Sequence, residues 1–375
     1  MNLADMLCYA DIHQLSKIAA HYDCECDGHS KNELIQSILN AISRKSNMDR
    51  FIEEMSLEDI RFVATLLFEN KSGYSLEELT ARAKQATILS TKESMSDTSR
   101  EMIVLYKHRG WLFNGFSEQT KFLFRVPQDL KLKISQSLEN RFRAQLHYTD
   151  EPTAYRDEQT LMVEDIFSYL RFVSKQDIAL TSDGTIYKRT LQGLLESLSV
   201  KEDPIGRVGF RFGYGRRYRE YPDRFSFIYD YCYYHDLFRE ENGLLHLTEA
   251  GLLRVHTAQK EDLGQIFRLW LRLYKGPIPN ILPLANWVIA LSKRWVTMRS
   301  LLACLCPLIK PYYYDTSNVV LESRVIRMLM HLGMLQIGEH PHDGIVVRST
   351  ANGEKVVKGI RIGEEETIRL PEKVI

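Results

Sequence analysis

The stretch GLLHLTEAG, residues 243–251, decides the predicted fold because GIVVRSTANG, residues 344–353, repeats its design. Both stretches open with a glycine, continue as a short strand and close in Thr-x-x-Gly. In this pattern the hydroxyl of Thr248 or Thr350 caps a local turn, and the glycine adopts backbone angles that other residues avoid. Each stretch is therefore predicted to end a β-hairpin in a turn. A third copy of the pattern, Leu180–Gly184, lies before the helix at 225–238 and not after a hairpin.

A helix is predicted before each hairpin. The helix-and-hairpin units comprise a helix at 225–238 with a strand at 244–247, a helix at 325–332 with strands at 333–337 and 345–348, and a helix at 102–109 with strands at 110–113 and 121–127. A helical core closed by a small β wing is the winged-helix arrangement. Units spaced by about 100 residues are too far apart for a solenoid repeat. The predicted fold class is therefore mainly α with small β wings (α+β), in tandem winged-helix domains.

The first part of the chain is predicted as two helices around a short loop. The helical spacing of residues 6–42 is interrupted at Asp27-Gly28, and Ser30 caps the second helix with Glu33 at the capping-box position. The run SKNELI, residues 30–35, resembles the SAP-like helix–extension–helix modules. In that family the second helix and the preceding loop meet the DNA backbone, which implies a phosphate contact for Lys31. Similar hairpins also serve as protein-docking modules.

Four domains follow from these patterns. They are a SAP-like module at 1–45 and winged-helix-like domains at 50–147, 155–260 and 261–375. A chain of 375 residues with 44% hydrophobic and 26% charged residues fits a soluble protein of several modules. This composition excludes wholesale disorder, collagen and a coiled-coil rod.

A cytoplasmic location is expected. The longest apolar stretches, 281–291 and 301–309, are shorter than the roughly 20 residues that span a bilayer. The N-terminal segment carries acids where a signal peptide needs positive charge. The six cysteines are expected to be reduced thiols. Nucleoid association would follow if the protein binds DNA.

The net charge of zero conceals segregation along the chain. Residues 207–224 contain six arginines against two acids, and residues 263–314 contain seven basic residues and no acid. Such asymmetry is typical of a local polyanion-binding face, but two domains of opposite charge that pack on each other would show it too. Both interpretations stay open.

Arginine alternates with aromatic residues in the segment 207–224, which combines phosphate contacts with rings on which bases stack. The alternative is that the alternation at Phe210–Phe212 builds a strand and that the Arg/Tyr pairs line a domain interface. The predicted nucleic-acid contacts are Lys31, Lys188, Arg189, Arg207, Arg211, Tyr214, Arg216, Arg217, Tyr218 and Arg219.

The common catalytic motifs are missing from the sequence. The dipeptide Gly-Lys of a phosphate-binding loop does not occur, and neither H-E-x-x-H nor G-x-S-x-G is present. The glycines 209, 213 and 215 lack the spacing of a dinucleotide-binding loop. The chain is therefore predicted to be non-enzymatic and to need no cofactor.

A zinc site is considered at the end of the first module. His21, Cys24, Cys26 and His29 span nine residues and offer the ligands that zinc prefers. A single residue between two cysteines is unusual for a tetrahedral site, so half-buried thiols and solvated histidines are the favoured interpretation. No metal is predicted. The residues 340–343 are expected to form a solvated loop, and Cys304 and Cys306 to lie in a core segment.

The run IALTSDGTIYKR, residues 178–189, resembles the accessory, non-motor region found beside bacterial XPB-type helicases. The SAP-like start, the segment 110–127 and the wing at 244–253 add to the resemblance. Both motor domains of those helicases are absent here, so the resemblance implies DNA binding or partner positioning without ATPase activity. It also implies work alongside a separate helicase or other DNA-processing partner.

The function predicted from sequence is thus that of a non-enzymatic DNA-associated protein of tandem winged helices. Winged helices commonly place one helix in the major groove and the wing on the backbone. The alternative is a protein–protein interaction scaffold that uses its winged helices without direct DNA binding.

Overall fold

The computed structural model describes residues 1–26, 28–69, 71–87, 95–206 and 212–359. It is mainly helical with small antiparallel sheets, which confirms the α+β class. The chain forms two compact units, unit 1 (Met1–Leu146) and unit 2 (His147–Ile375), each described by itself below. The predicted nucleic-acid contacts Arg207 and Arg211 lie outside the described residues, as does Asp27 of the predicted chain break.

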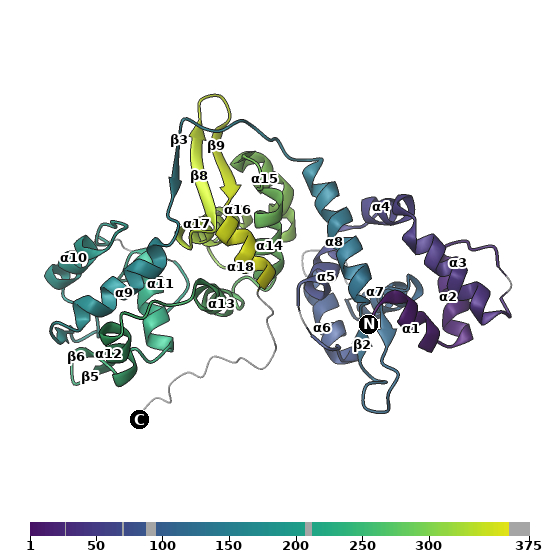
Figure 1. Cartoon of the computed structure of the whole chain (residues 1–375), viewed down its shortest axis with the longest axis horizontal. Helices are drawn as coiled ribbons and strands as arrows, with labels where there is room; N and C mark the ends of the chain where they lie inside the picture. Colours follow the sequence, from purple (N-terminus) through teal and green to yellow (C-terminus); the bar gives the residue numbers. More distant parts are fainter. Residues whose placement is uncertain (27, 70, 88–94, 207–211, 360–375) are drawn as a thin grey trace. The chain divides into compact units, whose positions relative to one another are not determined.

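Unit 1 is a helical body with one small hairpin (Figure 1). Its elements are α1 (Leu3–Tyr9), α2 (Ile12–His21), α3 (Lys31–Ser43), α4 (Lys45–Glu53), α5 (Leu57–Leu67), α6 (Leu76–Thr87), α7 (Met95–His108), β1 (Phe113–Asn114), β2 (Phe124–Arg125) and α8 (Gln128–Arg143). The predicted helix and hairpin at 102–127 are confirmed, because α7 leads into β1, which pairs antiparallel with β2. The strands are only two residues long.

The predicted helical hairpin at 6–42 contains a break that its spacing does not indicate. Ala10 is extended, with ψ of 145°, and ends α1. Asp11 then caps α2 by accepting a hydrogen bond from the Gln14 amide at 2.7 Å. The prediction of one first helix is therefore wrong, because two caps interrupt it. The Ser30 cap of α3 is confirmed, since its hydroxyl accepts a hydrogen bond from the Glu33 amide.

Unit 2 contains two helix–hairpin units of the same element order. The first helix–hairpin unit comprises α9 (Leu161–Val173), β4 (Ile178–Ala179), α10 (Lys188–Ser197), α11 (Asp223–Tyr234), β5 (Phe238–Glu241), β6 (Leu244–Leu247) and α12 (Glu249–His256). The second comprises α14 (Ile281–Leu291), β7 (Val296–Thr297), α15 (Met298–Leu305), a helical segment of α16 (Ser317–Val319), a π-helix (Val320–Ile326) and α17 (Arg327–His331), then β8 (Leu335–His340), β9 (Gly344–Ser349) and α18 (Ala351–Gly359). The helix α13 (Leu263–Tyr274) lies between them in sequence.

The sheets of the two helix–hairpin units share one strand order. The first has the order β4-β6-β5 and the second contains β7-β9-β8, so in each unit the first strand pairs with the last. A further strand, β3 (Ala154–Asp157), pairs antiparallel with β8 on the outside of the second sheet. Figure 1 shows β3 beside β8 and β9. The second sheet therefore includes a strand from outside the expected domain 261–375.

The Thr-x-x-Gly pattern has a different role from the predicted turn. Thr248 and Thr350 cap the helices α12 and α18, because their hydroxyls accept hydrogen bonds from the amides of Gly251 and Gly353 at 3.1 and 3.0 Å. Neither glycine has a positive φ. Each is needed for space instead, since a Cβ atom would lie 2.0 or 2.4 Å from a backbone carbonyl oxygen. In the third copy, Gly184 does adopt a positive φ of 72°, as expected.

The helix α11 has no solvent-facing stripe. Its residues 224–232 are all buried, including Arg224 and Asp230. The amides at its N-terminus, those of Arg224 and Phe225, donate hydrogen bonds to the Glu202 carboxylate. A helix that is enclosed in this way contributes to the core and offers little surface to a ligand.

A buried ion network connects α11 to its surroundings. Arg224 is 0% exposed and donates hydrogen bonds to Glu158 at 3.1 Å and to Asp165 at 2.7 Å. His331 of α17 lies 3.0 Å from Glu158 through Nδ1. Burial alone would raise the pKa of Glu158, but the hydrogen bond from His331 and the charge of Arg224 hold it below the usual value. The network links the first helix–hairpin unit to the second.

Candidate functional site

The arginines 216 and 217 are paired inside unit 2. Arg216 binds both carboxylate oxygens of Glu240, at 2.8 and 3.1 Å, and its guanidinium lies 3.7 Å from the ring centroid of Tyr233. Arg217 donates hydrogen bonds to Glu240 at 3.3 Å and to the Asp183 carbonyl at 3.0 Å. Burial would raise the pKa of Glu240, but its hydrogen bond with Arg216 holds it below the usual value. Internal acceptors therefore neutralise much of this positive charge.

The tyrosines of the same segment also have internal partners. Tyr214 is buried, and its hydroxyl donates a hydrogen bond to Asp315 at 3.1 Å. Burial raises its pKa, as does the neighbouring Asp315 carboxylate. Tyr218 accepts a hydrogen bond from the exposed Arg219 at 3.1 Å. Of these two contacts, the one between Tyr214 and Asp315 joins residues 101 positions apart in the sequence, whereas the one between Tyr218 and Arg219 is local.

The other predicted cations are exposed. Lys188 and Arg189 are the first two residues of α10, whose first turn contains no acid. The ammonium of Lys31 donates a hydrogen bond to the Cys8 carbonyl at 2.8 Å on the surface of unit 1. Among the described residues, no hydrogen bond connects Lys188 or Arg189 to Arg216 or Arg217. These cations therefore do not form one hydrogen-bonded cluster.

Asp230 should make the stability of unit 2 depend on pH. Burial raises the pKa of Asp230 to about 7, although its carboxylate accepts a hydrogen bond from the Arg216 amide. In the unfolded chain the pKa is about 3.9, so between these values only the folded state holds the proton, and stability falls as pH rises. The free energy of unfolding of the parent should therefore fall, relative to that of Asp230→Asn, by about 1–3 kcal/mol from pH 5 to pH 8. Thermal unfolding of both proteins at the two pH values measures this difference.

The control for this prediction is Asp236→Asn, which removes a carboxylate that is 66% exposed. Its stability should follow that of the parent over the same range. Parallel pH curves for the parent and Asp230→Asn would contradict the assignment of the effect to Asp230.

The four residues considered for zinc do not converge. The ring of His21 stacks on Phe51 with centroids 5.3 Å apart, and the Cys26 thiol lies 3.8 Å from the Cys24 carbonyl. Within the described ranges, no group of three or more His, Cys, Asp or Glu side chains could hold a metal ion.

In the same part of the chain, none of the helices is both long enough and apolar enough to cross a bilayer. The turn at 340–343 is tied back to unit 2, because Asp343 accepts a hydrogen bond from Thr149 at 2.7 Å.

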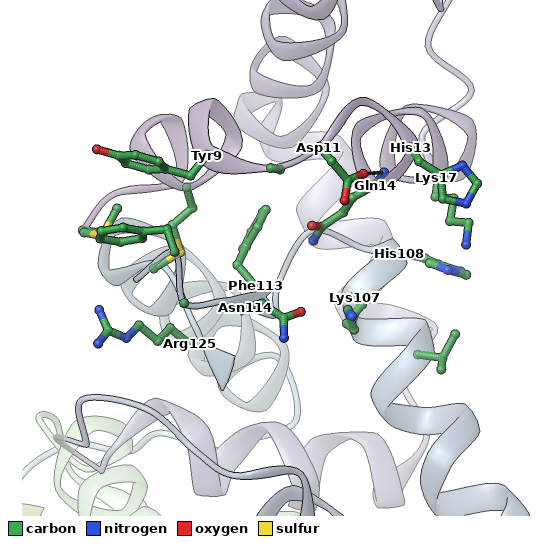
Figure 2. A pocket seen from close by; sticks show the side chains of 16 residues that line it. Tyr9, Asp11, His13, Gln14, Lys17, Lys107, His108, Phe113, Asn114 and Arg125 are labelled. Carbon is green, nitrogen blue, oxygen red and sulfur yellow. Dashed lines mark hydrogen bonds between the residues drawn. The ribbon is translucent and has the colours of Figure 1, made fainter. Parts of the chain in front are cut away.

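A pocket in unit 1 gathers charges that the sequence does not place together. It has a volume of about 490 Å³ and is lined by residues of α1, α2, α7 and the β1–β2 hairpin. We call it the cationic pocket. Figure 2 shows His13, Lys17 and His108 on one side of it, Tyr9 and Arg125 on the other, and Lys107 and Asn114 between them. The hairpin loop also brings Phe116 to its wall.

Each cation reaches the cationic pocket for a local reason. Lys17 lies on the exposed side of α2, opposite the buried residues Leu15 and Ile18. Lys107 and His108 end α7, where the negative end of the helix dipole favours positive side chains. Arg125 follows the buried Phe124 in β2, so the alternation of the strand turns it to the other face.

The lining of the cationic pocket contains more cations than carboxylates among the described residues. Burial lowers the pKa of Lys107, the Asp11 carboxylate raises it, and the charge of Lys17 lowers it by a smaller amount. Burial together with the charges of Lys17 and Lys107 likewise lowers the pKa of His108. The carboxylate that faces them, Asp11, already accepts the α2 capping hydrogen bond. A bound anion would relieve this repulsion.

Two buried polar atoms belong to residues that line the cationic pocket. Gln14 Nε2 and Arg125 Nε are buried atoms without a hydrogen-bond partner among the described residues. Asn114 is held in place by its hydrogen bond to the Lys121 carbonyl at 3.0 Å.

Comparisons with known proteins returned no match. No family model fits the sequence, no curated protein matches it, and no solved structure matches the fold. The geometry of the chain itself therefore carries the functional argument.

Proposed function

We propose that this chain is a non-enzymatic, DNA-associated protein that contacts the DNA backbone through the cationic pocket of unit 1. The observation that carries the proposal is that Lys17, Lys107 and Arg125 line one pocket, whose lining among the described residues contains one carboxylate, that of Asp11. Lysine and arginine in this arrangement neutralise phosphates and release counterions. The residues that line the pocket supply positive charge and hydrogen-bond donors, which suit the binding of a phosphate backbone.

The architecture of both units supports a DNA-associated class. The order helix, strand, helix, helix and hairpin, with the first strand paired to the last, is what tandem winged helices would have, and it occurs twice in unit 2. The capped helix α3 after a loop is what a SAP-like module would have. We include both assignments in the proposal, together with a separate helicase or other DNA-processing partner.

The contact is assigned to unit 1 because the corresponding helices of unit 2 are enclosed. In a winged helix the last helix before the hairpin enters the major groove. Here that helix is α11, which is buried, or the segment 317–331, whose residues 328–331 are buried. The same enclosure, with the pairing of Arg216 and Arg217 to Glu240, favours a protein–protein scaffold as the second candidate function.

The test is fluorescence anisotropy of labelled duplex DNA with the full chain across a salt series. Three phosphate contacts predict a slope of log K against log[salt] of about −3. Lys17→Gln with Lys107→Gln should reduce the magnitude of this slope by about 2 and weaken binding for every sequence alike.

The matched control is Lys188→Gln with Arg189→Gln, which removes two exposed positive charges from α10 in unit 2. Its slope should equal that of the parent. A loss of affinity in the α10 variant but not in the pocket variant would move the contact to unit 2. Absence of binding by the parent at low salt would favour the scaffold.

A further inference from the structure

An exposed pair of aromatic rings forms part of the cationic pocket. Tyr9 is 63% exposed and Phe116 is 51% exposed. Their rings stack on each other with centroids 4.4 Å apart and an interplanar angle of 14°. We call this pair the aromatic platform. Single exposed apolar side chains are common on protein surfaces, but a parallel pair beside a cluster of cations is a feature to be explained.

The loop that carries Phe116 is held in one conformation. The Gly115 amide donates a hydrogen bond to the Leu123 carbonyl at 2.9 Å, and the hydroxyls of Ser117 and Thr120 are 2.7 Å apart. A Cβ atom on Gly115 would lie 2.2 Å from the Thr120 carbonyl oxygen, so the loop closes tightly at this glycine. Phe116 is thus presented by an ordered turn, which lowers the entropy cost of stacking a ligand on it.

We propose that the cationic pocket binds unpaired nucleotides, with a base stacked on the aromatic platform and phosphates at Lys17, Lys107 and Arg125. This inference rests on the proposed function and names its ligand as single-stranded nucleic acid. Exposed rings interleaved with cations are the means by which proteins hold single strands without reading their sequence. In a duplex the base faces are covered by neighbouring pairs, so the platform can only take bases that are unstacked.

The size of the pocket agrees with this ligand. A volume of about 490 Å³ falls in the range of sites that enclose a small molecule. Gln14 and Asn114 line the same pocket, and their amides can donate to or accept from the edge of a base. The charge, the aromatic surface and the volume of the pocket thus suit one nucleotide at a time.

The test compares a labelled single-stranded oligothymidylate with the same oligonucleotide carrying abasic positions, and both with a duplex. Tyr9→Ala with Phe116→Ala should weaken single-strand binding by about 10- to 100-fold while the salt slope stays unchanged. The parent should bind the abasic strand about as weakly as this variant binds the intact strand. The control, Phe122→Ala, removes a ring that is 73% exposed on the same hairpin, and its affinity should match that of the parent.

Three outcomes would overturn the inference. Equal affinity for the single strand and the duplex, with the platform variant unchanged, would remove the stacking role and leave the DNA-backbone contact standing. A loss in Phe122→Ala as large as in the platform variant would show that the effect does not come from the pocket. Absence of binding by the parent to either DNA at low salt would remove both the inference and the proposed function. Circular dichroism and thermal unfolding establish that each variant is folded.

Discussion

Replacing Arg224 with methionine is expected to lower the free energy of unfolding of unit 2 by about 3–5 kcal/mol. Arg224 is fully buried and is the cation between Glu158 and Asp165. Methionine fills a similar space but leaves these carboxylates in a desolvated interior without their shared partner. The large effect comes from the charge of Asp165, which loses its paired cation, whereas Glu158 keeps Arg156 at 2.6 Å and His331 at 3.0 Å.

Asp165 also fixes the backbone that follows α10. Its carboxylate also accepts hydrogen bonds from the amides of Ser199 and Val200, at 2.5 and 3.2 Å. Protonating or moving Asp165 would therefore loosen the segment that follows α10. Urea unfolding followed by tryptophan fluorescence and circular dichroism measures the change.

The control for Arg224→Met is Arg189→Met on the exposed surface of α10, with an expected change within about 0.5 kcal/mol. A loss below about 1 kcal/mol in Arg224→Met would show that the two carboxylates do not depend on this arginine. It would also show that the ion network does not stabilise the packing of the two helix–hairpin units on each other.

Gly251→Ala and Gly353→Ala should each destabilise unit 2 by about 2–4 kcal/mol. The added methyl group would lie 2.0 Å from the Leu237 carbonyl oxygen in the first case and 2.4 Å from the Met334 carbonyl oxygen in the second. Both oxygens belong to the backbone beside a hairpin, so relief requires the helix α12 or α18 to move away from its strand. Thermal and urea unfolding provide the measurement.

Gly193→Ala is the matched control for these two variants. Gly193 lies inside α10, and a Cβ atom there would meet nothing within 4 Å among the described residues. Alanine should stabilise this helix by about 0.5–1 kcal/mol. If Gly251→Ala and Gly353→Ala behaved like Gly193→Ala, the close approach of helix and hairpin would not be the reason for these glycines.

The hairpins could be predicted from sequence because their signals are local. Alternating residues, a glycine at the turn and Thr-x-x-Gly at the end lie within ten residues of one another. The role of the glycine could not be predicted, since the carbonyl that it meets comes from a residue some 14 to 19 positions earlier. The break at Ala10 was missed for another reason, because Leu7 and Leu15 keep helical spacing across it.

The charged segments were harder to interpret because a sequence window shows charges without their partners. Arg216 and Arg217 lie among four other arginines in the sequence, yet Glu240 faces both in the folded chain. The cationic pocket is the reverse case. Lys17, Lys107 and Arg125 belong to separate elements that lie far apart in the sequence. Folding brings charges together that local patterns do not connect.

The pairing of β3 with β8 has a consequence for synthesis on the ribosome. Asp157 of β3 and Gln336 of β8 are 179 residues apart in sequence. At about 5–20 residues per second, β3 emerges roughly 10–40 s before its partner strand has been made. The first helix–hairpin unit can assemble in that interval from its own strands, whereas the second sheet cannot be completed. Until then β3 is an unpaired strand on a nascent chain, and the second sheet can be completed only after most of unit 2 has been synthesised.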